Sequence, residues 1–576
     1  MYDLKVLKIL FFHYFSSIIR IFIVFMKKIS IAGTFLYFLF ASDFHAVETH
    51  LNIQENDGKD VIFHEQSIKP LFTGSGDNIL LSFTLNCNDT DQQSVVEKIV
   101  LIFSRMSAVS GISSVNVFSR TPSMPESEYK LFGSSASGKE KIIIKGDQKL
   151  AAGENKIIVR VSLREDADLL GKLKLDKIRI MLDDGSQLAL PDYKFQEYRF
   201  AKKLRTAGQD NCNTYRIPGL ITTNAGTLIA VYDNRYNGSK DLQEDIDIGM
   251  SRTTDGGQTW EPMKVIIDMG EYGGRSQKLN GTGDPCILYD HITNTIWVAA
   301  LWMSGSGPDQ MLWWESKPGM SPEETGQFVL VKSTDDGVTW SAPYTITGQI
   351  KDPAWQLLLQ GPGRGITMKD GTLVFPAQFK ADIGEKAIDG GRYTCHSTIV
   401  YSRDAGNTWH IGTGAKTNTT EAQVVELSDG SLMLNMRDDS NRKDITETNG
   451  RAVSTTSDLG ATWVTHSSSN HSLPEPNCMA SIISADLMVS GKMKKVLFFS
   501  NPDNKTTRSD MTIKASLDEG VTWPAGYSVL LNHDEGYGYS CLTMVDENTV
   551  AILYEGVKEL YFQKIPVRDI ILTGKK

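Results

Sequence analysis

Runs of alternating apolar and polar residues recur along the chain and predict β-strands, because side chains of a strand with one buried face alternate with a period of two. In the first third of the chain these runs are NILLSFTL, KIVLIFS, KIIIKG, NKIIVRVSL and LDKIRIML. All five lie between residues 47 and 190 and predict a small N-terminal β-sandwich-like domain. Such a domain either binds carbohydrate or spaces the rest of the chain, and the runs favour neither alternative.

A second pattern, Ser/Thr-x-Asp-x-Gly-x-Thr-Trp, occurs five times further along. The copies are TTDGGQTW (253–260), STDDGVTW (333–340), SRDAGNTW (402–409), TSDLGATW (456–463) and SLDEGVTW (516–523). Each copy follows an alternating run and ends on a Trp that begins another apolar run. Because Asp bonds nearby backbone N–H groups and Gly accepts positive φ, each copy is predicted to be a hairpin turn. Five copies of a catalytic acid would be redundant, so we expect these aspartates to be structural.

The loose spacing of these Asp boxes suits blades of four strands and is typical of a β-propeller. Counting four strands around each box places first strands near Arg216, Asp284, Gln360, Glu421, Asn477 and Tyr539. We therefore predict an all-β chain with a six-bladed propeller over residues 191–576. The last blade has three clear runs and no box. A strand from YKFQEYRFA (193–201) would complete it and leave no open sheet edge.

The first 46 residues are predicted to be a signal or targeting segment. Met26 is followed by the charged pair Lys27 and Lys28, then by the apolar run ISIAGTFLYFLFA and a cleavage site near Ala46. Met26 is thus the favoured true start, and export to the periplasm or the exterior is expected. A membrane anchor is the alternative. Each apolar run falls short of a span of about 20 residues, so no permanent membrane span is expected.

Composition excludes several classes of partner. The net charge is −10 and no basic stripe offsets it, which argues against nucleic acid. Six scattered cysteines form no C-x-x-C pair, so we expect most of them to be free and buried. No His/Cys/carboxylate spacing indicates a metal site, and no cofactor fingerprint is present, so we expect neither metal nor cofactor. Any anion that binds must therefore meet a local cluster of cations.

The stretch NTYRIPGL (213–220) places one such cation at the start of an apolar strand. Pro218 fixes its own φ and biases Ile217 towards extended conformations, so the strand is predicted to begin here. Arg216 would stand at its mouth, on the face of a propeller that also carries the loops between second and third strands. Six residues are expected on this face: Arg216, Asp241, Glu421, Arg437, Arg508 and Tyr539.

Three guanidiniums in one small site indicate an anionic ligand, because arginine presents paired planar donors that match a carboxylate or phosphate. A sugar carboxylate fits. For any single arginine, a solvated surface charge is the simpler interpretation. Three arginines at corresponding blade positions make that interpretation much weaker.

Tyr-Arg-Ile-Pro, the five Asp boxes, TEAQVVELSDGSLMLNMRD and GYGYSCL together resemble the bacterial exo-α-sialidases, or neuraminidases, of the retaining family, especially those of gut and oral Bacteroidetes. The resemblance covers about residues 195–570, and the small N-terminal β-domain is also similar. It implies release of terminal sialic acids from glycoproteins, glycolipids and oligosaccharides. The roles that it implies are a carboxylate-binding triad of Arg216, Arg437 and Arg508, an acid/base Asp241, a nucleophile Tyr539 and its partner Glu421.

The chemistry of sialic acid agrees with these roles. Its carboxylate is attached to the anomeric carbon, so an anionic nucleophile would approach against like charge. A neutral tyrosine avoids this repulsion but, with a pKa near 10, needs a base within hydrogen-bonding reach. Asp241 would protonate the leaving oxygen and then activate water. Two displacements would retain the anomeric configuration.

Some assignments stay open on sequence alone. Tyr537 would face the same side of an extended strand as Tyr539, and Tyr539 is preferred because it directly precedes SCL, as in the family. By resemblance, Arg235 would contact a sugar hydroxyl, and Asp284 the O4 or amide region, with structural roles at strand ends as the alternative. A trans-sialidase would use the same residues. A sialoglycan-binding propeller without turnover would need only the arginines.

Overall fold

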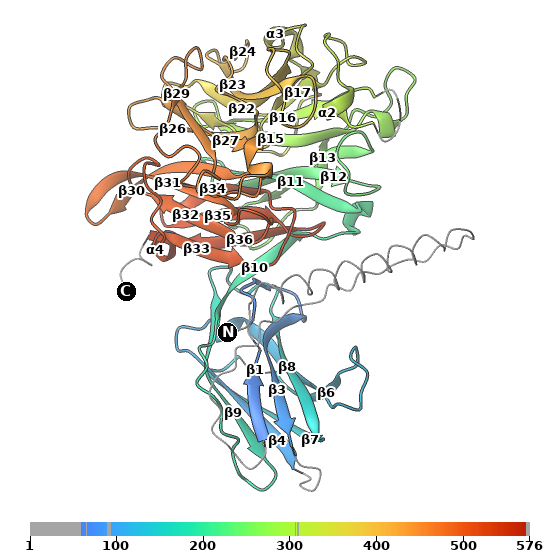
Figure 1. The fold of residues 1–576 in the computed structure, drawn as a ribbon, viewed down its shortest axis with the longest axis vertical. Coiled ribbons are helices and arrows are strands. Elements are labelled where there is room, and N and C mark those ends of the chain that lie inside the picture. Colours follow the sequence, from blue (N-terminus) through green and yellow to red (C-terminus); the bar gives the residue numbers. More distant parts are fainter. Residues whose placement is uncertain are drawn as a thin grey trace, which may run out of the picture. The chain divides into compact units, whose positions relative to one another are not determined.

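The computed structural model describes residues 59–571 except 65, 89–93, 137, 306 and 308–309, so the predicted signal segment lies outside the described residues. The described chain is built almost entirely of strands (Figure 1). Its α-helices are single short turns: α2 (Leu312–Glu315), α3 (Thr347–Ile350) and α4 (Val567–Ile571). Within this part of the chain, none of the helices has the length and apolarity to span a bilayer.

Two antiparallel sheets form the N-terminal region, and the five alternating runs noted above all lie in their strands. One sheet has the order β1 (Lys59–Phe63), β3 (Asn78–Cys87), β8 (Gly153–Leu163), β5 (Ile112–Arg120), β6 (Lys130–Ser135). The other contains β9 (Lys172–Leu182), β4 (Val95–Phe103) and β7 (Lys141–Lys149). Buried side chains from both, such as Phe83 and Val159 from one and Ile99 and Ile180 from the other, share one core. Burial of these alternate positions is what the period of two predicts.

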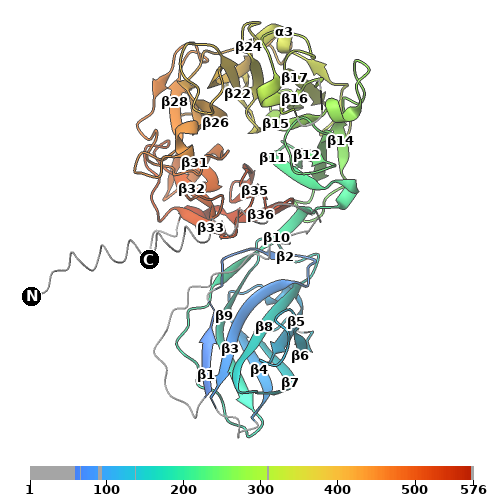
Figure 2. The ribbon, with the colours of Figure 1, turned by 45° about the vertical axis from the view of Figure 1, so that its right-hand side comes forward.

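The rest of the chain forms a β-propeller, whose sheets stand in a ring in Figure 2. Each sheet is built around an antiparallel meander that begins near one of the predicted first strands. The first sheet contains β11 (Thr214–Thr222), β12 (Leu228–Arg235), β13 (Ile246–Thr253) and β14 (Lys264–Ile267); the second contains β15 (Thr282–Asp290), β16 (Thr295–Trp302), β17 (Gln327–Ser333), β18 (Tyr344–Thr345) and β20 (Gly363–Arg364). In the second sheet, β20 adds a parallel pairing with β15.

The third sheet contains β19 (Leu357–Gln360), β21 (Ile366–Thr367), β22 (Leu373–Ala381), β23 (Thr394–Ser402), β24 (His410–Ile411) and β25 (Lys416–Thr417). The fourth contains β26 (Thr419–Glu426), β27 (Leu432–Asp438), β28 (Ala452–Thr456) and β29 (Val464–Thr465), and the fifth contains β30 (Ser481–Val489), β31 (Lys492–Pro502), β32 (Met511–Ser516) and β33 (Ser528–Asn532). Apolar side chains fill the spaces between adjacent sheets. Trp297 of the second sheet, for example, meets Trp409, which lies between β23 and β24 of the third, edge to face.

The last propeller sheet contains β34 (Ser540–Asp546), β35 (Thr549–Glu555) and β36 (Leu560–Pro566), and it is completed by a strand from far earlier in the chain. This strand, β10 (Glu197–Arg205), pairs antiparallel with β36, with Lys202 opposite Phe562. A completing strand is therefore present where one was expected, but it is shifted from 193–201: residues 202–205 make the pairing with β36. Its first residues also pair with β9, and β2 (Leu71–Phe72) pairs with it in parallel. One strand thus belongs to both the propeller and the N-terminal sheets.

The five Asp boxes form the hairpins after β13, β17, β23, β28 and β32, which confirms the turn prediction. In the second box, Ser333 Oγ donates to Asp335 Oδ1 (2.8 Å), and the Thr339 backbone N–H donates to the same oxygen (2.9 Å). Thr339 Oγ1 donates to Asp335 Oδ2 (2.5 Å), and Gly337 has φ +82°. The four other box aspartates make the same contacts: Asp255, Asp404, Asp458 and Asp518. All six cysteines are buried and free.

Candidate active site

A cavity of about 350 Å³ lies where the inner strands of the propeller begin, and five predicted site residues line it: Asp241, Asp284, Glu421, Arg437 and Tyr539. The other three predicted residues contact members of this group. Arg235 is hydrogen-bonded to Asp241, and the guanidiniums of Arg216 and Arg508 lie 5.2 and 5.6 Å from the centre of the Tyr539 ring. The structure therefore brings all eight residues into one cluster, although they come from segments spread over most of the propeller.

Tyr539, Glu421 and Arg437 form the centre of the cluster. The Tyr539 hydroxyl donates to Glu421 Oε1. Arg437 Nη1 donates to Glu421 Oε2 (2.6 Å) and to the Tyr539 oxygen (3.1 Å). Burial, together with the Glu421 carboxylate, raises the pKa of Tyr539 well above its ordinary value despite the opposing guanidiniums of Arg437 and Arg508. The phenol is therefore protonated in the resting protein and touches a base that can take its proton.

The choice between the two tyrosines depends on the backbone around Gly538. The sequence argument placed Tyr537 and Tyr539 on one side of an extended strand. This is wrong, because β34 begins only at Ser540 and Gly538 has φ +87°. Both rings contact the Arg216 guanidinium, whose carbon lies 4.7 Å from the centre of the Tyr537 ring, and the hydroxyl of Tyr539 is the one that reaches Glu421.

Arg216 is held by a glutamate that the sequence analysis missed. Glu555, at the end of β35 and almost fully buried, accepts from Arg216 Nε (3.0 Å) and Nη2 (3.4 Å). The same carboxylate accepts from the backbone N–H groups of Ile217 (2.8 Å) and Tyr539 (2.9 Å). Glu555 therefore fixes the first arginine relative to the tyrosine. In the sequence, Glu555 is distinguished only as the single charged residue near the end of the apolar run TVAILYEG.

The backbone conformation of Ile217 differs from the one predicted for the residue before Pro218. The residue before a proline was expected to be extended, but Ile217 has φ +58°, which is rare for a β-branched side chain. The register of β11 against β12 shifts between Arg216 and Gly219. A bulge of this kind re-aims a side chain. Here it lies next to Arg216, and the Ile217 N–H bonded to Glu555 holds it in place.

Asp241 lies in the loop between β12 and β13, and its side chain is 56% exposed at the cavity. Arg235 Nη1 donates to Asp241 Oδ1 (2.7 Å), and Arg216 Nη1 lies 3.7 Å from the same oxygen. Burial favours the neutral acid, but Arg235 and Arg216 outweigh it and lower the pKa of Asp241. In the ligand-free protein this carboxyl is therefore ionised.

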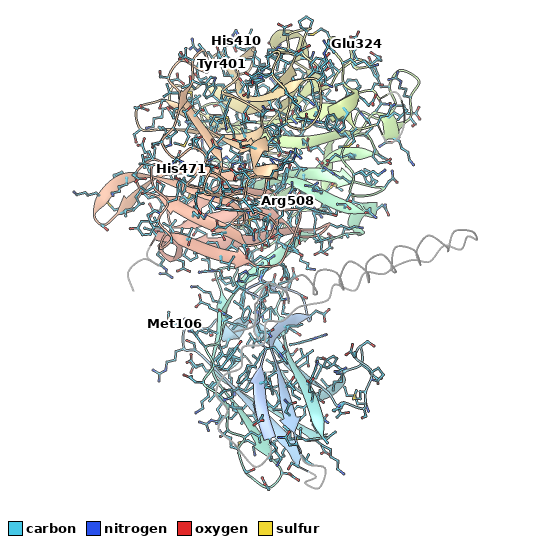
Figure 3. All side chains as sticks on the ribbon, viewed as in Figure 1. Met106, Glu324, Tyr401, His410, His471 and Arg508 are labelled. Atoms are coloured by element: carbon cyan, nitrogen blue, oxygen red, sulfur yellow. The ribbon has the colours of Figure 1, made fainter. Side chains whose placement is uncertain are left out.

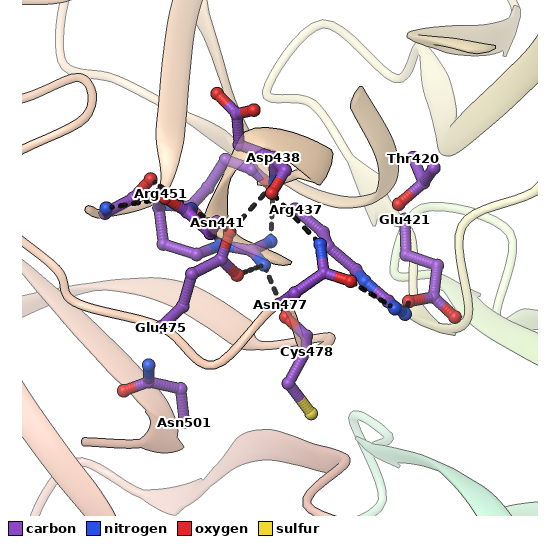
Figure 4. Close-up of polar contacts among 12 residues, drawn as sticks. Thr420, Glu421, Arg437, Asp438, Asn441, Arg451, Glu475, Asn477, Cys478 and Asn501 are labelled. Carbon is purple, nitrogen blue, oxygen red and sulfur yellow. Dashed lines mark hydrogen bonds and ion pairs between the residues drawn. The ribbon is translucent and has the colours of Figure 1, made fainter. Parts of the chain in front are cut away.

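A polar network around Asn477 orients Arg437 (Figure 4), and Arg508 bonds to backbone oxygens beside it. Arg437 Nη2 donates to Asn477 Oδ1 (2.9 Å), and Arg508 donates to the backbone oxygens of Asn477 (3.2 Å) and Tyr537 (2.8 Å). A fully buried ion pair, Arg451 Nη1 to Glu475 Oε2 at 2.6 Å, adjoins this network. Arg508 itself is labelled in Figure 3. Asn477, Glu475 and Arg451 are further residues that sequence reasoning did not find.

Arg235 and Asp284 both contact a buried carboxylate, Asp233. Arg235 donates to Asp233 Oδ2 through Nε (3.0 Å) and Nη2 (2.7 Å), and the Asp284 backbone N–H donates to Asp233 Oδ1 (2.9 Å). Burial and the neighbouring carboxylates Asp233 and Asp241 raise the pKa of Asp284 well above its ordinary value. These surroundings favour the neutral form of Asp284, which can donate a hydrogen bond into the cavity. Arg235 is largely committed to protein partners.

The side of the cavity away from the arginines is apolar. Met311, Leu312, Trp313 and Trp314 line it together with Leu301, Leu357 and Leu359. Lys380 Nζ lies 4.2 and 4.7 Å from the ring centres of Trp313 and Trp314, which holds the two indoles in place. The site thus joins a cationic floor to an apolar wall. No trio of histidine, cysteine or carboxylate side chains in the described part of the chain is placed to bind a metal ion.

Comparison with known proteins identifies the family. The family model for a BNR repeat-like domain matches residues 226–552. A sialidase of Bacteroides fragilis (strain YCH46) is 43% identical over 542 residues, which cover 89% of this chain and 96% of that protein. The chain belongs to the sialidase family. Among solved structures, the Hadza microbial sialidase Hz136 superposes with a TM-score of 0.78 at 40% identity, covering 89% of this chain and all of that one.

A more distant structure defines the limits of the likeness. The intramolecular trans-sialidase from Ruminococcus gnavus has a TM-score of 0.52 at 18% identity and covers 64% of this chain. At this identity the similarity shows a shared fold alone. The resemblance noted from the motifs is thus confirmed, as are the propeller architecture and the assignment to the exo-sialidases.

Proposed function

We propose that this enzyme removes terminal sialic acids from glycoproteins, glycolipids and oligosaccharides by a retaining double displacement with Tyr539 as the nucleophile. The observation that carries the proposal is the direct hydrogen bond from the Tyr539 hydroxyl to Glu421, with Arg437 contacting both and Asp241 lining the same cavity. A binding protein would need the arginines but would have no use for a buried phenol paired with a base.

The arginines are suited to the carboxylate of the substrate. Arg508 makes its hydrogen bonds to backbone oxygens, so it pairs with no protein carboxylate among the described residues. Arg437 and Arg216 are each paired with a glutamate, which orients the guanidinium toward the cavity. Paired N–H donors on a carboxylate give strong, oriented hydrogen bonds. The apolar wall supplies a surface for the uncharged groups of the sugar.

In the first step, the Tyr539 oxygen forms a bond to the anomeric carbon as the glycosidic C–O bond breaks. Glu421 accepts the phenolic proton, and Asp241 donates a proton to the departing oxygen. In the second step, Asp241 removes a proton from water, whose oxygen displaces Tyr539, and Glu421 returns the proton to the phenol. Each step inverts the anomeric centre, so the product retains its configuration. Sialidases with a tyrosine nucleophile are a recognised exception to the pairing of two carboxylates.

The protonation of Asp241 requires the substrate. Arg216 and Arg235 keep this carboxyl ionised in the ligand-free protein. Once the substrate carboxylate engages Arg216, the attraction of that guanidinium for Asp241 weakens, and departure of water from the half-exposed side chain adds a desolvation penalty on the charge. Both effects favour the neutral acid, which is the form needed to protonate the leaving group.

Proton NMR of the purified enzyme with α2,3-sialyllactose tests the proposal. Early appearance of the α-anomer of free sialic acid, followed by slower mutarotation, is the expected result. First appearance of the β-anomer would overturn the double displacement, and broadened sialic acid signals without release would favour a binding protein. Added lactose labelled with ¹³C separates hydrolysis from transfer, because a trans-sialidase would return sialic acid to the labelled acceptor.

Such substrates lie outside the cell, in keeping with the predicted signal segment. We therefore include secretion across the inner membrane, to the periplasm or beyond, in the proposal. Fractionation of the producing cells and sequencing of the mature N-terminus test it. A mature protein that begins near residue 47 in the exported fraction is expected, and retention of residues 26–46 in the cytoplasm would contradict it.

A further inference from the structure

A second cavity, of about 310 Å³, lies on the propeller face opposite the catalytic residues. The two cavities share no lining residue, but they are connected by the same inner strands. Arg216 is near the start of β11 and Thr222 at its end; Glu421 and Glu426 are related in the same way on β26. The six residue steps from Arg216 to Thr222 would span at most about 20 Å at 3.3 Å per residue, and the bulge at Ile217 shortens this distance. The second cavity is therefore separate from the site of the proposed reaction.

Arg364, the second residue of β20, lines this cavity and has no anionic partner. Its Nη1 makes two long hydrogen bonds, to the Leu542 backbone oxygen (3.3 Å) and to Thr543 Oγ1 (3.4 Å). Its Nε is buried without a hydrogen-bond partner in the described part of the chain. Burial lowers the pKa of Arg364 below its ordinary value, because no carboxylate offsets it. A partly buried guanidinium whose Nε lacks a hydrogen-bond partner is unfavourable unless an anion completes it.

Four other arginines in the interior of the propeller ring differ from Arg364. Arg216, Arg235, Arg437 and Arg451 each form an ion pair with a carboxylate. Arg508 lacks one, as Arg364 does, and it is one of the three arginines assigned to the substrate carboxylate. The absence of a protein carboxylate is thus shared with an arginine that is placed to receive one from a ligand.

The neighbours of Arg364 suit an oxyanion. Thr543 Oγ1 lies between the Arg364 guanidinium and Thr222 Oγ1, which is 3.1 Å away and donates to the Met544 backbone oxygen. With the Thr222 proton used in this way, the Thr543 hydroxyl donates to Thr222 Oγ1 in the ligand-free protein and can turn to donate to a bound oxyanion instead. Glu426 is the only carboxylate in the lining, and it accepts from the Lys369 backbone N–H (2.9 Å) without pairing with Arg364. A volume near 300 Å³ is within the range of small-molecule sites.

We propose that this cavity is a second ligand site, which binds the carboxylate or phosphate group of a small molecule through the Arg364 guanidinium and the Thr543 hydroxyl. The alternative is that Arg364 merely caps the Leu542 carbonyl. The two readings predict different responses to anions. A capping arginine would affect stability whether or not anions are present, whereas a ligand-binding arginine gives a saturable anion effect that disappears with its side chain.

Isothermal titration calorimetry of the full chain distinguishes them. Because the catalytic arginines also bind anions, the protein is first saturated with the inhibitor 2,3-dehydro-2-deoxy-N-acetylneuraminic acid. Inorganic phosphate or acetate is then titrated at constant ionic strength. A single saturable site is expected, with affinity reduced about tenfold or more, a difference of at least 1.4 kcal/mol, in Arg364→Met. Preference between phosphate and acetate identifies which oxyanion the site favours.

Two further variants provide the controls. Arg403→Met removes an exposed arginine of the same propeller and should leave the titration unchanged. Thr543→Val keeps the guanidinium and should weaken binding by a smaller factor. Each variant must retain the hydrolytic activity of the unaltered enzyme, which shows that it is folded. Equal phosphate and acetate binding by Arg364→Met and the unaltered enzyme would overturn the proposal, as would the absence of any saturable binding.

Crystals soaked in selenate locate the anion independently. An anomalous selenium peak within hydrogen-bonding distance of Arg364 supports the site. Peaks confined to the catalytic arginines would overturn it.

Discussion

The hydroxyl of Tyr539 donates directly to Glu421, although the two residues are far apart in the sequence. Tyr539 directly precedes the last propeller sheet, and Glu421 lies near the start of the fourth. The strands of both sheets start at the same end of the propeller, so their first residues meet across the cavity. Arg437, on the strand next to Glu421, contacts both partners. The proposed nucleophile, its base and a carboxylate-binding arginine thus form a single hydrogen-bonded unit.

Tyr539→Phe is expected to reduce kcat by about 10³-fold or more, roughly 4 kcal/mol, while changing the affinity for sialic acid little. The substitution removes only the attacking oxygen. Steady-state kinetics with sialyllactose and calorimetry with a sialic acid analogue measure the two quantities. Tyr537→Phe is the matched control, because this ring packs on Arg216 without touching Glu421, and it should retain most activity. Equal losses in the two variants would contradict the assignment.

Asp241→Asn should depend on the leaving group. Loss of a general acid slows departure of a sugar alkoxide by roughly 10²- to 10⁴-fold, whereas a 4-nitrophenolate leaves without protonation. The rate of formation of the Tyr539 intermediate, measured by stopped flow, should therefore fall much more for sialyllactose than for 4-nitrophenyl sialoside. Similar losses on both substrates would show that Asp241 positions the substrate instead of protonating it.

Glu555→Gln should raise KM more than it lowers kcat. The neutral amide can accept from Arg216 or from the two backbone N–H groups, but it no longer balances the buried guanidinium. Weakening a buried charge pair changes binding by a few kcal/mol, so we expect KM to rise about tenfold or more. Glu547→Gln, at an exposed turn, is the control. An unchanged KM for Glu555→Gln would show that Arg216 is positioned by other contacts.

Asp335→Ala should lower the melting temperature and leave kcat/KM of the folded protein within about twofold of the original, less than about 0.5 kcal/mol. Hydrogen bonds from Thr339 and Ser333 lower the pKa of Asp335 to about 2. The contribution of this carboxylate is therefore present at neutral pH and decreases as the pH falls through the folded-state value. Thermal unfolding at pH 7 and pH 3 measures it. A stable but inactive variant would count against a structural role.

The contribution of Asp247 to stability is expected to change with pH in the opposite direction. Burial, reinforced by the nearby Asp268, raises the pKa of Asp247 to about 7, and Tyr236 donates to its carboxyl (2.9 Å). Between an unfolded value near 3.9 and about 7, the folded protein holds a proton that the unfolded chain has released, so stability declines as the pH rises. Asp247→Asn should therefore stabilise the protein at pH 8, by up to about 4 kcal/mol, and have little effect at pH 4. Asp176→Asn, an exposed substitution, should show no such trend. A pH-independent effect of Asp247→Asn would contradict the raised pKa.

Much of the fold could be predicted because it depends on local patterns. Alternation defines the strands, and the five Asp boxes mark the hairpins that divide them into sheets. The site residues were recognisable for a related reason: Arg216, Glu421 and Tyr539 are polar residues at the starts of apolar strands. Their convergence follows from the propeller, whose inner strands all begin on one face.

The residues that sequence reasoning missed act across sheet boundaries. Glu555 matters because the end of β35 meets the start of β11, and Asn477 because it joins Arg437 to Arg508. Neither contact leaves a repeated or periodic signal. The conformation of Ile217 is a similar case: the local bias of an Ile-Pro step is overridden by one hydrogen bond to a carboxylate far away in sequence.

The double pairing of β10 affects how the protein can acquire its structure. The propeller ring closes only when Lys202 lies opposite Phe562, so β36 must pair with a strand that was synthesised much earlier. Nascent chains therefore lack a closed ring until β36 has been made. The earlier strand, β10, also joins β9. A truncation that removes the N-terminal sheets but keeps residues 197–205 would leave that edge of β10 uncovered, an open template for pairing with a second molecule.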